Sequence, residues 1–566
     1  MKTSTRKILD KSFSALALSS MAIMGAVAVA FLAPIIIKGA GAVYFDATVE
    51  HFKFLREVLD RGSESELAQM VSRSDAAREK LYSLMRAYES PADFAELSGK
   101  IAAARNDAFA KAAAQSQSFI KILDENKGAA AAPIIKAEGE KLFAPYGRLV
   151  ADSVKHPSPA MAEFLAGERE TLQKAVRKFT AKLGEIRKLS VLEKGRIRRE
   201  LPASAFAAVA DAAEKAAQSN AAYAAFKTGV AELLGPMTAA EKESAKMMRR
   251  RFGQTRMDNA VKVLDESVLH IHIMSADAQG RQTSESVDVR EHFKGTPLAE
   301  MAECAEKNLA AMMQQRHTFY WGFFYASPYD YNIFGGIFPM ILGTFYLTAG
   351  AMIFAAPLGI VAAIYFSEYA KNGRVVNFLR MCVGTLAGVP SIVFGLFGLA
   401  FLINTVKVSE SKSVLAGSIT LALLILPTII RSCEEALKTV PNSYREAALG
   451  LGAGKWRAIC TVILPAALPS MLTGIIISMG RAAGETAPII FTAATSTGAA
   501  LALGDVFTQA TPALPWNIYN ICSEHEMADK IVHVQYGMVL TLIAIVLALN
   551  SVAIVVRDRL GRKLRG

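Results

Sequence analysis

The sequence predicts a mainly α-helical, polytopic membrane protein with about six transmembrane helices and a large, mostly helical external domain inserted after the first span. With a mean hydropathy of +0.28, the 566-residue chain is too apolar for an ordinary soluble protein and too polar for a bare membrane bundle. Apolar runs long enough to cross a bilayer occur near the N-terminus and again after residue 333. The 38–332 segment between them contains no such run.

The N-terminal 1–37 segment is expected to be a cytoplasmic N-terminus followed by a transmembrane anchor. A basic start, MKTSTRKILDK, precedes an apolar run from Phe13 to Ile37. The apolar core of a cleaved signal peptide is roughly 7–15 residues long, which is shorter than this run. Ala28-Val29-Ala30 resembles a cleavage site, so a removed signal peptide is the alternative.

The 38–332 segment is predicted to fold as a mostly helical external domain. Its Ala-rich stretches favour helix by intrinsic propensity. Capping residues followed by Pro, or by Glu three positions later, mark the helix starts. These signals stand at Ser90-Pro91, Ser158-Pro159, Thr296-Pro297 and Thr238–Glu241.

One part of this domain is predicted to be a β-hairpin. VLHIHIMS at 268–275 alternates apolar and polar residues, 276–280 reads as a turn, and QTSESVDV follows. His270 and His272 then share one strand face. A metal site there needs a third ligand that the nearby sequence does not supply, so solvated histidines are the preferred interpretation and a metal site is the alternative.

Five further spans are expected in the remainder of the chain. They lie near 338–367, 377–405, 413–432, 465–495 and 534–556. Pro357, Pro390 and Pro469 predict kinks in three of them. Six spans starting inside place 38–332 outside the membrane and the 433–464 loop in the cytoplasm, which fits the short basic loops on one side.

Composition excludes several other classes. The net charge of +12 comes largely from Lys and Arg beside apolar runs, where they set orientation, so we expect no nucleic acid partner. The five cysteines form no C-x-x-C pair, which indicates neither a disulfide framework nor a zinc site.

The loop before the fourth of these later spans, EAALGLGAGKWRAICTVILP at 446–465, has an unusual pattern. A helix reaching about Leu451 is expected to break at Gly452 and Gly454 and to restart at Lys455, giving a helix–turn–helix at the membrane face. GLGAGK is not a P-loop, because the motif requires G-x-x-x-x-G-K-[ST] and Trp456 follows the lysine.

The spacing in this loop resembles the EAA loop of permease subunits of binding-protein-dependent ABC importers, E-A-A-x₃-G-x₉-I-x-L-P. The matching residues are Glu446, Ala447, Ala448, Gly452, Leu464 and Pro465, with Val462 in the Ile position. Three more segments look like the PstA-type permeases of phosphate importers: GVPSIVFGLFG (388–398), GRAAGETAP (480–488) and LPWNIY (514–519). Ala483 stands where that family more often has Ile.

The resemblance implies an ABC importer permease fold for 333–566, with a cytoplasmic EAA loop at 433–464, in a bacterial inner membrane that places 38–332 in the periplasm. It implies that the six matching loop residues couple the chain to an ATPase. It also implies a second permease subunit in a heterodimer, two cytoplasmic ATPase subunits and a periplasmic phosphate-binding protein. ATP would be bound and hydrolysed by the partner, so the chain is expected to be a transport subunit, without enzymatic activity, a cofactor or a metal of its own.

Arg481, Glu485 and Arg431 are the predicted substrate path. Arg481 and Glu485 are four apart in an apolar span, where charges are costly and usually functional. A guanidinium suits phosphate oxygens, and a carboxylate accepts a hydrogen bond that protonated phosphate, unlike sulfate, donates. The alternatives are a mutual salt bridge for the pair and a positive-inside anchor for Arg431. At the level of the whole chain they are a sulfate or molybdate permease, or a transmembrane sensor.

Overall fold

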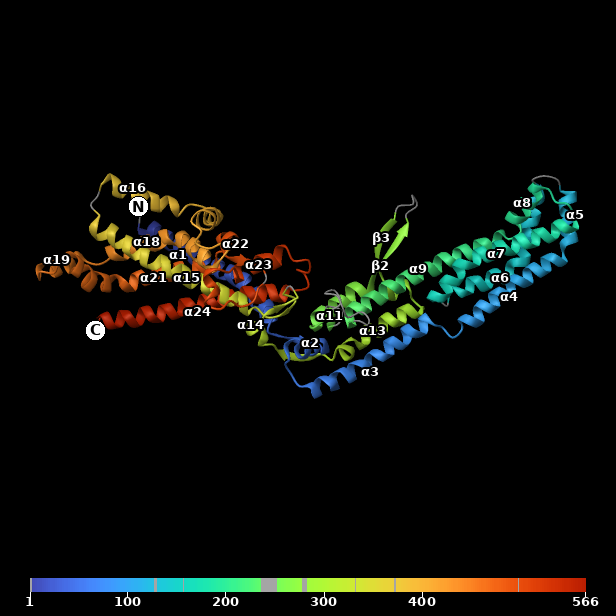
Figure 1. Ribbon diagram of the computed structural model, residues 1–566, viewed down its shortest axis with the longest axis horizontal. Coiled ribbons are helices and arrows are strands. Elements are labelled where there is room, and N and C mark those ends of the chain that lie inside the picture. Colours follow the sequence, from blue (N-terminus) through green and yellow to red (C-terminus); the bar gives the residue numbers. More distant parts are fainter. Residues whose placement is uncertain are drawn as a thin grey trace. The chain divides into compact units, whose positions relative to one another are not determined.

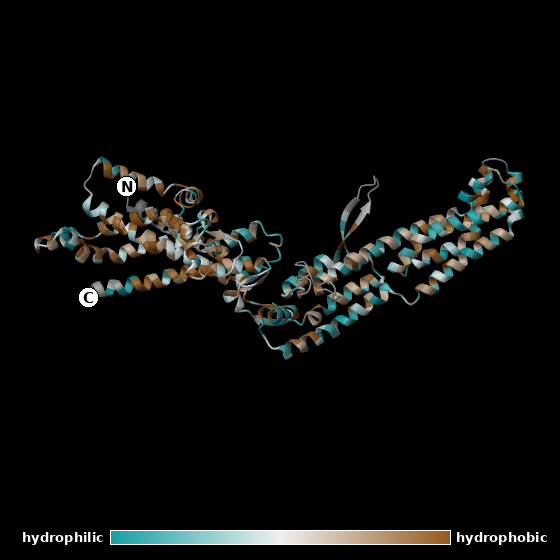
Figure 2. Cartoon of the chain, in the orientation of Figure 1, coloured by the Kyte–Doolittle hydropathy of each residue, from teal (hydrophilic) through white to brown (hydrophobic). Residues whose placement is uncertain are grey.

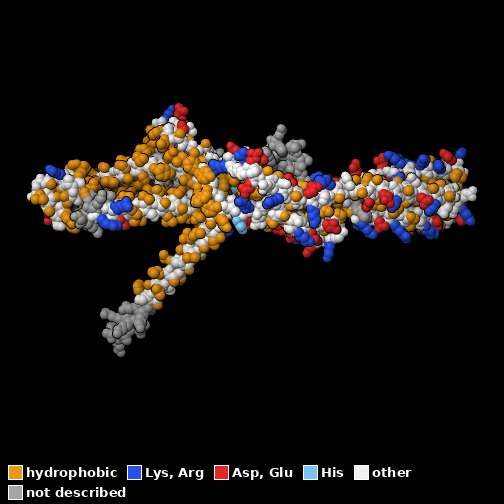
Figure 3. Space-filling model, turned by 90° about the horizontal axis from the view of Figure 1, so that it is seen from below, with side chains coloured by type: hydrophobic (Ala, Val, Ile, Leu, Met, Phe, Trp, Pro, Cys, Tyr) orange, Lys and Arg blue, Asp and Glu red, His pale blue; other side chains and the backbone are white. Residues whose placement is uncertain are grey.

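The computed structural model describes residues 3–126, 130–155, 157–235, 252–276, 282–330, 332–370, 373–496 and 498–565. The chain divides into two compact units, one made of Met1–Phe45 and Thr318–Gly566 and the other of Asp46–His317 (Figure 1). Hydrophobic residues predominate along the helices of the first unit (Figure 2), and on the face drawn in Figure 3 its surface is largely apolar, whereas charged side chains are spread over the second unit. The first unit therefore has the surface of a membrane domain and the second that of a water-exposed one.

The first unit consists almost entirely of helices, some of them with π-helical turns. Its longer elements are α1 (Thr3–Ala40), α15 (Phe338–Ile364), η4 (Tyr365–Tyr369), α16 (Arg374–Leu386), α17 (Ser391–Phe397), η5 (Gly398–Thr405), α18 (Val414–Lys438), α19 (Asn442–Gly450), α20 (Lys455–Ala458), η6 (Ile459–Ile463), α21 (Leu464–Gly484), α22 (Ala487–Thr492), α23 (Leu514–Ser523) and α24 (Val532–Arg565). Its short elements are α14 (Gly322–Tyr325), β5 (Pro328–Tyr329), β6 (Phe334–Gly335), β7 (Ala494–Thr495), η7 (Asp505–Phe507) and β8 (Thr511–Pro512). β1 (Tyr44–Ala47) pairs with β4 (Arg316–Phe319). The chain passes from one unit to the other within each of these two strands.

Five helices in the described residues are long and apolar enough to cross a membrane, and a bent pair raises the number to six. They are Phe13–Ala40, Phe338–Tyr369, Val414–Lys438, Lys455–Gly484 and Val532–Arg559. The prediction of a mainly α-helical, multi-pass membrane protein with about six spans is confirmed.

The predicted span at 377–405 differs from the kinked helix that we expected. Its two halves, α16 and α17–η5, meet at an angle of 102°. Pro390 precedes the first residue of α17 with φ −57° and ψ 139°, so the chain stops being helical before the proline and starts again after it. The segment is a broken span or a re-entrant loop rather than one tilted helix.

The predicted boundaries around the EAA loop also need correction. α18 continues to Lys438, and the next membrane-length helix already begins at Lys455, so the connection between them is shorter than 433–464. That helix ends at Gly484 instead of reaching residue 495, because Pro488 cannot continue it and opens α22 instead.

The core of the first unit lies where α15, α18 and α21 pack against one another. Small residues let these helices approach closely. A Cβ added to Gly359 of α15 would lie 2.5 Å from Ile429 Cγ2 of α18, and one added to Gly474 of α21 would lie 2.2 Å from Ser432 Cβ. α1 packs on α24, with Gly39 against the Tyr536 carbonyl oxygen.

The second unit is a bundle of helices with one β-hairpin. Its elements are α2 (Val49–Leu59), α3 (Glu64–Glu89), α4 (Phe94–Ala114), α5 (Ser116–Glu125), α6 (Ala131–Ser153), α7 (Pro159–Ile186), α8 (Val191–Glu200), α9 (Ala203–Leu234), α11 (Met257–Val263), η3 (Leu264–Leu269), β2 (His270–Ala276), β3 (Gln282–Asp288), α12 (Val289–His292) and α13 (Pro297–Met313). They enclose two hydrophobic cores, and the 32-residue α9 belongs to both. Val209 lies in the core formed with α4–α8, whereas Phe226 lies in the core formed with α3, η3 and α13.

The helix-start signals in this unit have mixed outcomes. Ser158 caps α7, where its hydroxyl accepts from the Met161 N–H and Pro159 is the first helical residue. α13 does begin at Pro297, although the Thr296 hydroxyl donates to Phe293 O instead of capping. The signal at Ser90-Pro91 was wrong, because Ser90 ends α3 and α4 begins only at Phe94. Thr238–Glu241 lies outside the described residues.

The predicted hairpin is confirmed as the antiparallel pair β2–β3, in register from His270 opposite Asp288 to Ala276 opposite Gln282. The strand begins two residues later than expected, because 268–269 complete the π-helical turn η3. Its predicted turn falls largely outside the described residues.

Candidate functional site

The helix–turn–helix predicted from the EAALGLGAGK stretch is present. α19 ends at Gly450, and Gly452 adopts φ +83°, the left-handed conformation that ends helices and that favours glycine. The Ala453 N–H donates to Ala448 O, which closes the turn. Gly454 precedes α20, and the helix then runs through η6 into α21 without a break. The loop is thus continuous with a membrane-length helix.

The outer edge of this turn is apolar and exposed. Leu451 is 89% exposed and Trp456 63%, and Tyr444 and Leu449 are each about half exposed at 51% and 52%. Glu446 and Ala447 are exposed beside them, whereas Ala448 is buried against the loop. Leu464 and Pro465 lie half-buried at the start of α21. An exposed apolar patch with polar residues at its rim is typical of a protein-docking surface.

Arg481 and Glu485 form a mutual ion pair, which is the alternative to a substrate role, but not in the middle of a helix. Arg481 Nε lies 3.1 Å from Glu485 Oε1. Arg481 is in the last turn of α21, and Glu485 follows the final helical residue with extended backbone. The arginine side chain is 48% exposed and the glutamate 19%. The bond to Glu485 engages Nε, which leaves the two terminal NH₂ groups of the half-exposed guanidinium able to contact another group.

Glu485 lines a small cavity at the end of α21. Thr344 and Thr348 of α15, Leu421 of α18 and Ala513 are among the other residues around it. The Thr344 hydroxyl is already engaged, since it donates to Met340 O and accepts from the Leu514 N–H.

The two glycines beside the pair, Gly480 and Gly484, do not mark a close contact between helices. A Cβ added to Gly484 would meet nothing within 4 Å, and one added to Gly480 would make ordinary contacts with α24 at 3.5 Å or more. The close helix approach in α21 is instead at Gly474.

Arg431 lies within α18, seven residues before the helix ends, rather than at the end of the span. Its Nη2 atom would lie 2.7 Å from a Cβ added to Gly384 of α16, so the guanidinium reaches the first arm of the broken span. Gly474 contacts Ser432, the residue next to Arg431, whereas Arg481 is seven residues further along α21. At 1.5 Å per residue, the two arginines differ by about 10 Å in level along the bundle. The structure does not bring Arg431 to the Arg481–Glu485 pair.

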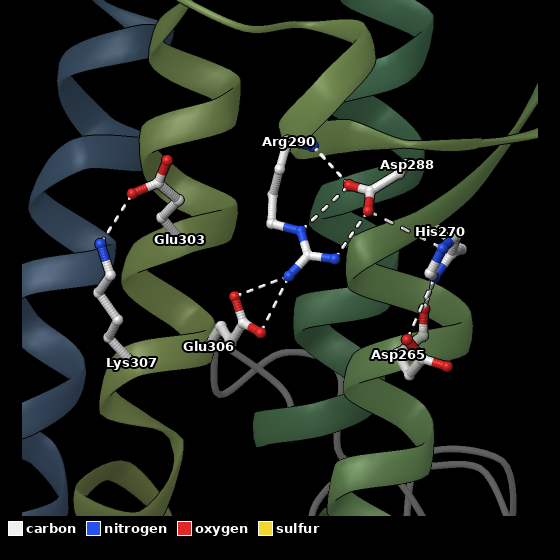
Figure 4. A network of polar contacts seen from close by, with 7 residues as sticks. All are labelled: Asp265, His270, Asp288, Arg290, Glu303, Glu306 and Lys307. Atoms are coloured by element: carbon white, nitrogen blue, oxygen red, sulfur yellow. Dashed lines mark hydrogen bonds and ion pairs between the residues drawn. The ribbon is translucent and has the colours of Figure 1, made fainter.

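His270 belongs to a polar network at the base of the hairpin (Figure 4). Its Nδ1 atom lies 3.2 Å from Asp265 Oδ1, and its Nε2 atom 4.0 Å from Asp288 Oδ2. Arg290 joins Asp288 to Glu306 of α13, with Nη2 2.7 Å from Asp288 Oδ2 and Nη1 2.9 Å from both Glu306 oxygens. His272 is exposed. The network fastens the hairpin to α13, and the described residues contain no metal-binding group of three or more ligands.

The sequence analysis missed two residues that hold the EAA loop in place, Arg445 and Glu368. Arg445 Nη2 lies 2.8 Å from Glu368 Oε1 at the end of α15, 77 positions away. A signal was available, because Glu368 is the only carboxylate between 333 and 409 and Arg445 directly precedes the EAA triplet. A single carboxylate in a long apolar region usually has a partner.

Comparison with known proteins gives a consistent picture for the first unit. Residues 355–566 match the family described as "Binding-protein-dependent transport system inner membrane component". These residues include the EAA loop, the Arg481–Glu485 pair and Arg431.

Several curated proteins are similar to this chain. "Phosphate transport system permease protein PstA 1" of Mycobacterium tuberculosis is 36% identical over 231 residues, 41% of this chain and 72% of that protein. "Phosphate transport system permease protein PstA" of Yersinia pestis is 44% identical over 158 residues, 28% of this chain and 52% of that protein. "Probable ABC transporter permease protein YqgI" of Bacillus subtilis is 37% identical over 163 residues, 29% of this chain and 55% of that protein. This chain therefore spans about half the length of two of these three relatives.

Among solved structures, inward-facing forms of the MetNI methionine ABC transporter are similar to 40% of this chain and 94% of theirs. Sequence identity is 16% and 18%, with TM-scores of 0.30 and 0.32.

Proposed function

This chain belongs to the binding-protein-dependent transport system inner membrane component family and is a PstA-type permease, and from that premise we propose that it forms part of the translocation path of an ATP-driven phosphate importer. As a member of this permease family, the chain is a multi-pass membrane protein and a subunit of a transporter. ATP would be bound and hydrolysed by a partner chain, and this chain would convert the movement of that partner into a movement of its own helices.

The observation that carries the proposal is the exposed apolar turn of the EAA loop. Leu451 and Trp456 expose 89% and 63% of their surface at the tip of a turn that is continuous with α21. Exposing such side chains costs free energy, on the order of 1.5–3 kcal/mol for each large apolar side chain left unburied. A partner surface that receives the turn recovers that free energy. We assign this role to the ATPase, with Glu446 and Ala447 at the rim of the contact.

Phosphate is the proposed substrate because of the chemistry at the end of α21. The Arg481 guanidinium is half exposed on an apolar helix, and its planar fork of donors matches phosphate oxygens. Glu485 would accept a hydrogen bond from protonated phosphate, which sulfate cannot donate. The similarity to phosphate transport system permease proteins supports the same substrate.

The partners follow from this role. We propose a second, related permease subunit against the exposed Arg481 face, two ATPase subunits on the EAA loop and a periplasmic phosphate-binding protein. We further propose that the chain lies in a bacterial inner membrane with its N-terminus in the cytoplasm. The short basic connections beside the spans support that orientation.

The test is reconstitution of the complete transporter in proteoliposomes with ATP on the ATPase side. We expect uptake of radiolabelled phosphate that requires ATP and the binding protein, and that excess sulfate or molybdate does not compete away. Uptake of sulfate or molybdate in place of phosphate would overturn the substrate. An assembled transporter with the same uptake in the presence and absence of ATP would overturn the coupling.

A further inference from the structure

The π-helical turn η4 at the end of α15 is contacted by cationic side chains from three separate elements. Arg445 comes from α19, Lys455 from α20 and Arg380 from α16. π-helical turns are frequent at functional positions because they re-aim the side chains that they carry. This turn carries Glu368 and Tyr369 next to each other.

Arg445 contacts both the turn and the end of α18. Besides the 2.8 Å contact from Nη2, its Nε lies 3.2 Å from Glu368 Oε1 and 3.3 Å from Oε2. Its Nη1 donates to Val440 O at 2.7 Å, and Nη2 also donates to Leu437 O at 2.9 Å. Arg445 is 20% exposed and Glu368 only 8%. A guanidinium whose donors are shared between a carboxylate and two carbonyls fixes α19 relative to both helices.

Lys455 adds a contact from the other side of the glycine turn. Its Nζ atom lies 4.8 Å from the centre of the Tyr369 ring, within the range of a cation–π interaction. The two arms of the EAA loop, separated by Gly452, therefore hold adjacent residues of one turn.

Arg380 extends the connection to the broken span. It donates from Nη2 to Phe366 O at 2.9 Å, and the same atom lies 3.0 Å from Glu434 Oε1 of α18. Through Arg380, the η4 turn is therefore connected to α16 and α18 as well as to the EAA loop.

We propose that Glu368 and Tyr369 form the anchor through which both arms of the EAA loop move the transmembrane helices, with Arg445 and Lys455 as positioning residues. The proposal rests on the proposed coupling to an ATPase. A displacement of α19 is passed directly to α15 and α18, which pack along the core of the unit. Without the anchor, α19 stays joined to α18 and, through the Gly452 turn, to α20 and α21, but it loses the Arg445 contact with the end of α15. An ATPase can then move α19 with less displacement of α15.

The experiment compares ATP hydrolysis with phosphate uptake in the same proteoliposomes. We expect Arg445→Gln and Tyr369→Ala to assemble and hydrolyse ATP, with at least a tenfold loss of phosphate taken up per ATP. Tyr369→Phe keeps the ring and should keep the wild-type ratio. Arg374→Gln, which changes an exposed arginine at the start of α16, is the matched control. A wild-type ratio in both Arg445→Gln and Tyr369→Ala would overturn the proposal.

A second measurement needs no substrate and so separates this inference from the choice of phosphate. Hydrogen–deuterium exchange of the α19 amides is compared in the wild-type and Arg445→Gln complexes. We expect about tenfold faster exchange over 442–450 in the variant, with the α15 amides unchanged. Identical exchange in α19 would overturn the anchor even if phosphate uptake were normal. Absence of phosphate uptake by the wild type, with exchange accelerated as expected, would overturn the substrate alone.

Discussion

Gly474 of α21 lies so close to Ser432 of α18 that a Cβ built on the glycine would be 2.2 Å from the serine Cβ. The position therefore has no room for a side chain unless the helices separate. We expect Gly474→Ala to destabilise the protein by about 1–3 kcal/mol through overpacking. Thermal unfolding of the purified chain in detergent measures it, with Gly484→Ala on the same helix as the control, since a Cβ there meets nothing within 4 Å. Equal melting temperatures for the two variants would contradict the packing described.

Substitutions at Gly452 test whether the EAA turn needs a left-handed backbone conformation, because a side chain at this position would make no steric clash. Its φ is +83° and a Cβ would meet nothing, so only the left-handed conformation restricts the residue. We expect Gly452→Val to insert normally and to lose transport, because a non-glycine residue in that conformation costs roughly 1–2 kcal/mol and a β-branched one more. Gly452→Asn, which tolerates this region, should keep most of the activity.

The control for the turn is Gly454→Ser. Gly454 has an ordinary φ of −66° at the start of α20, where serine is a favourable capping residue. Normal phosphate uptake by Gly452→Val at wild-type abundance would rule out a need for the turn in coupling.

Substitutions of Arg481 and Glu485 can distinguish a structural role of the pair from a role in binding the substrate. Arg481→Ala alone leaves an unpaired carboxylate, so a loss of transport would be ambiguous. The double variant Arg481→Gln with Glu485→Gln removes both charges and nearly keeps the shape. We expect it to insert and assemble but not to take up phosphate. Near-normal uptake at normal abundance would defeat the substrate role of both residues and leave the permease assignment intact.

His51 predicts acid sensitivity of the second unit. Its burial, and then the charge of Arg256, lower the pKa of His51 to about 4. This pKa is lower than that of a histidine in the unfolded chain. The contribution of neutral His51 to the free energy of unfolding is therefore fully present above about pH 6.5 and is lost as pH falls toward 4, by up to ~3 kcal/mol. Burial raises the pKa of its neighbour Glu50, which contributes with the opposite sign.

Thermal unfolding at pH 7.5 and pH 5, followed by circular dichroism, measures this effect. We expect the drop in melting temperature to shrink in His51→Gln and to stay in His272→Gln, which changes an exposed histidine. A drop of the same size in all three proteins would mean that His51 is not its source.

Labelling of single cysteines in a cysteine-free background tests the proposed topology. A membrane-impermeant thiol reagent added from the periplasm should modify Ser98→Cys, on an exposed face of α4, and not Ser443→Cys on α19. Modification of Ser443→Cys from that side would invert the six-span arrangement.

The features that the sequence predicted well depend on short-range patterns. Gly452 and its spacing from the EAA triplet predicted the turn, because glycine adopts a positive φ at little cost. The apolar runs predicted the spans, because length and hydropathy are local properties. The end of α21 could also have been predicted, since Pro488 stops a helix, but the predicted span extends beyond this proline to residue 495 because the sequence stays apolar.

The remaining features depend on neighbours that are distant in the chain. Arg445 and Glu368 are 77 residues apart, and nothing in either local pattern points to the other. The 102° bend at Pro390 is sharper than a proline requires, so packing must set the angle. The reach of Arg431 toward Gly384 likewise depends on the side that α16 presents to α18.

The sharing of α9 between two cores has a consequence for how the second unit comes apart. Melting of α9 in either core removes one wall of the other, because the same continuous hydrogen-bonded helix supplies both. Gly229 of α9 lies directly against Ser267 O of η3, and Gly139 of α6 lies against Leu201 O, two residues before α9 begins. We therefore expect the second unit to unfold in one cooperative step rather than as two separate subdomains, and a force applied at one end to be resisted by both cores.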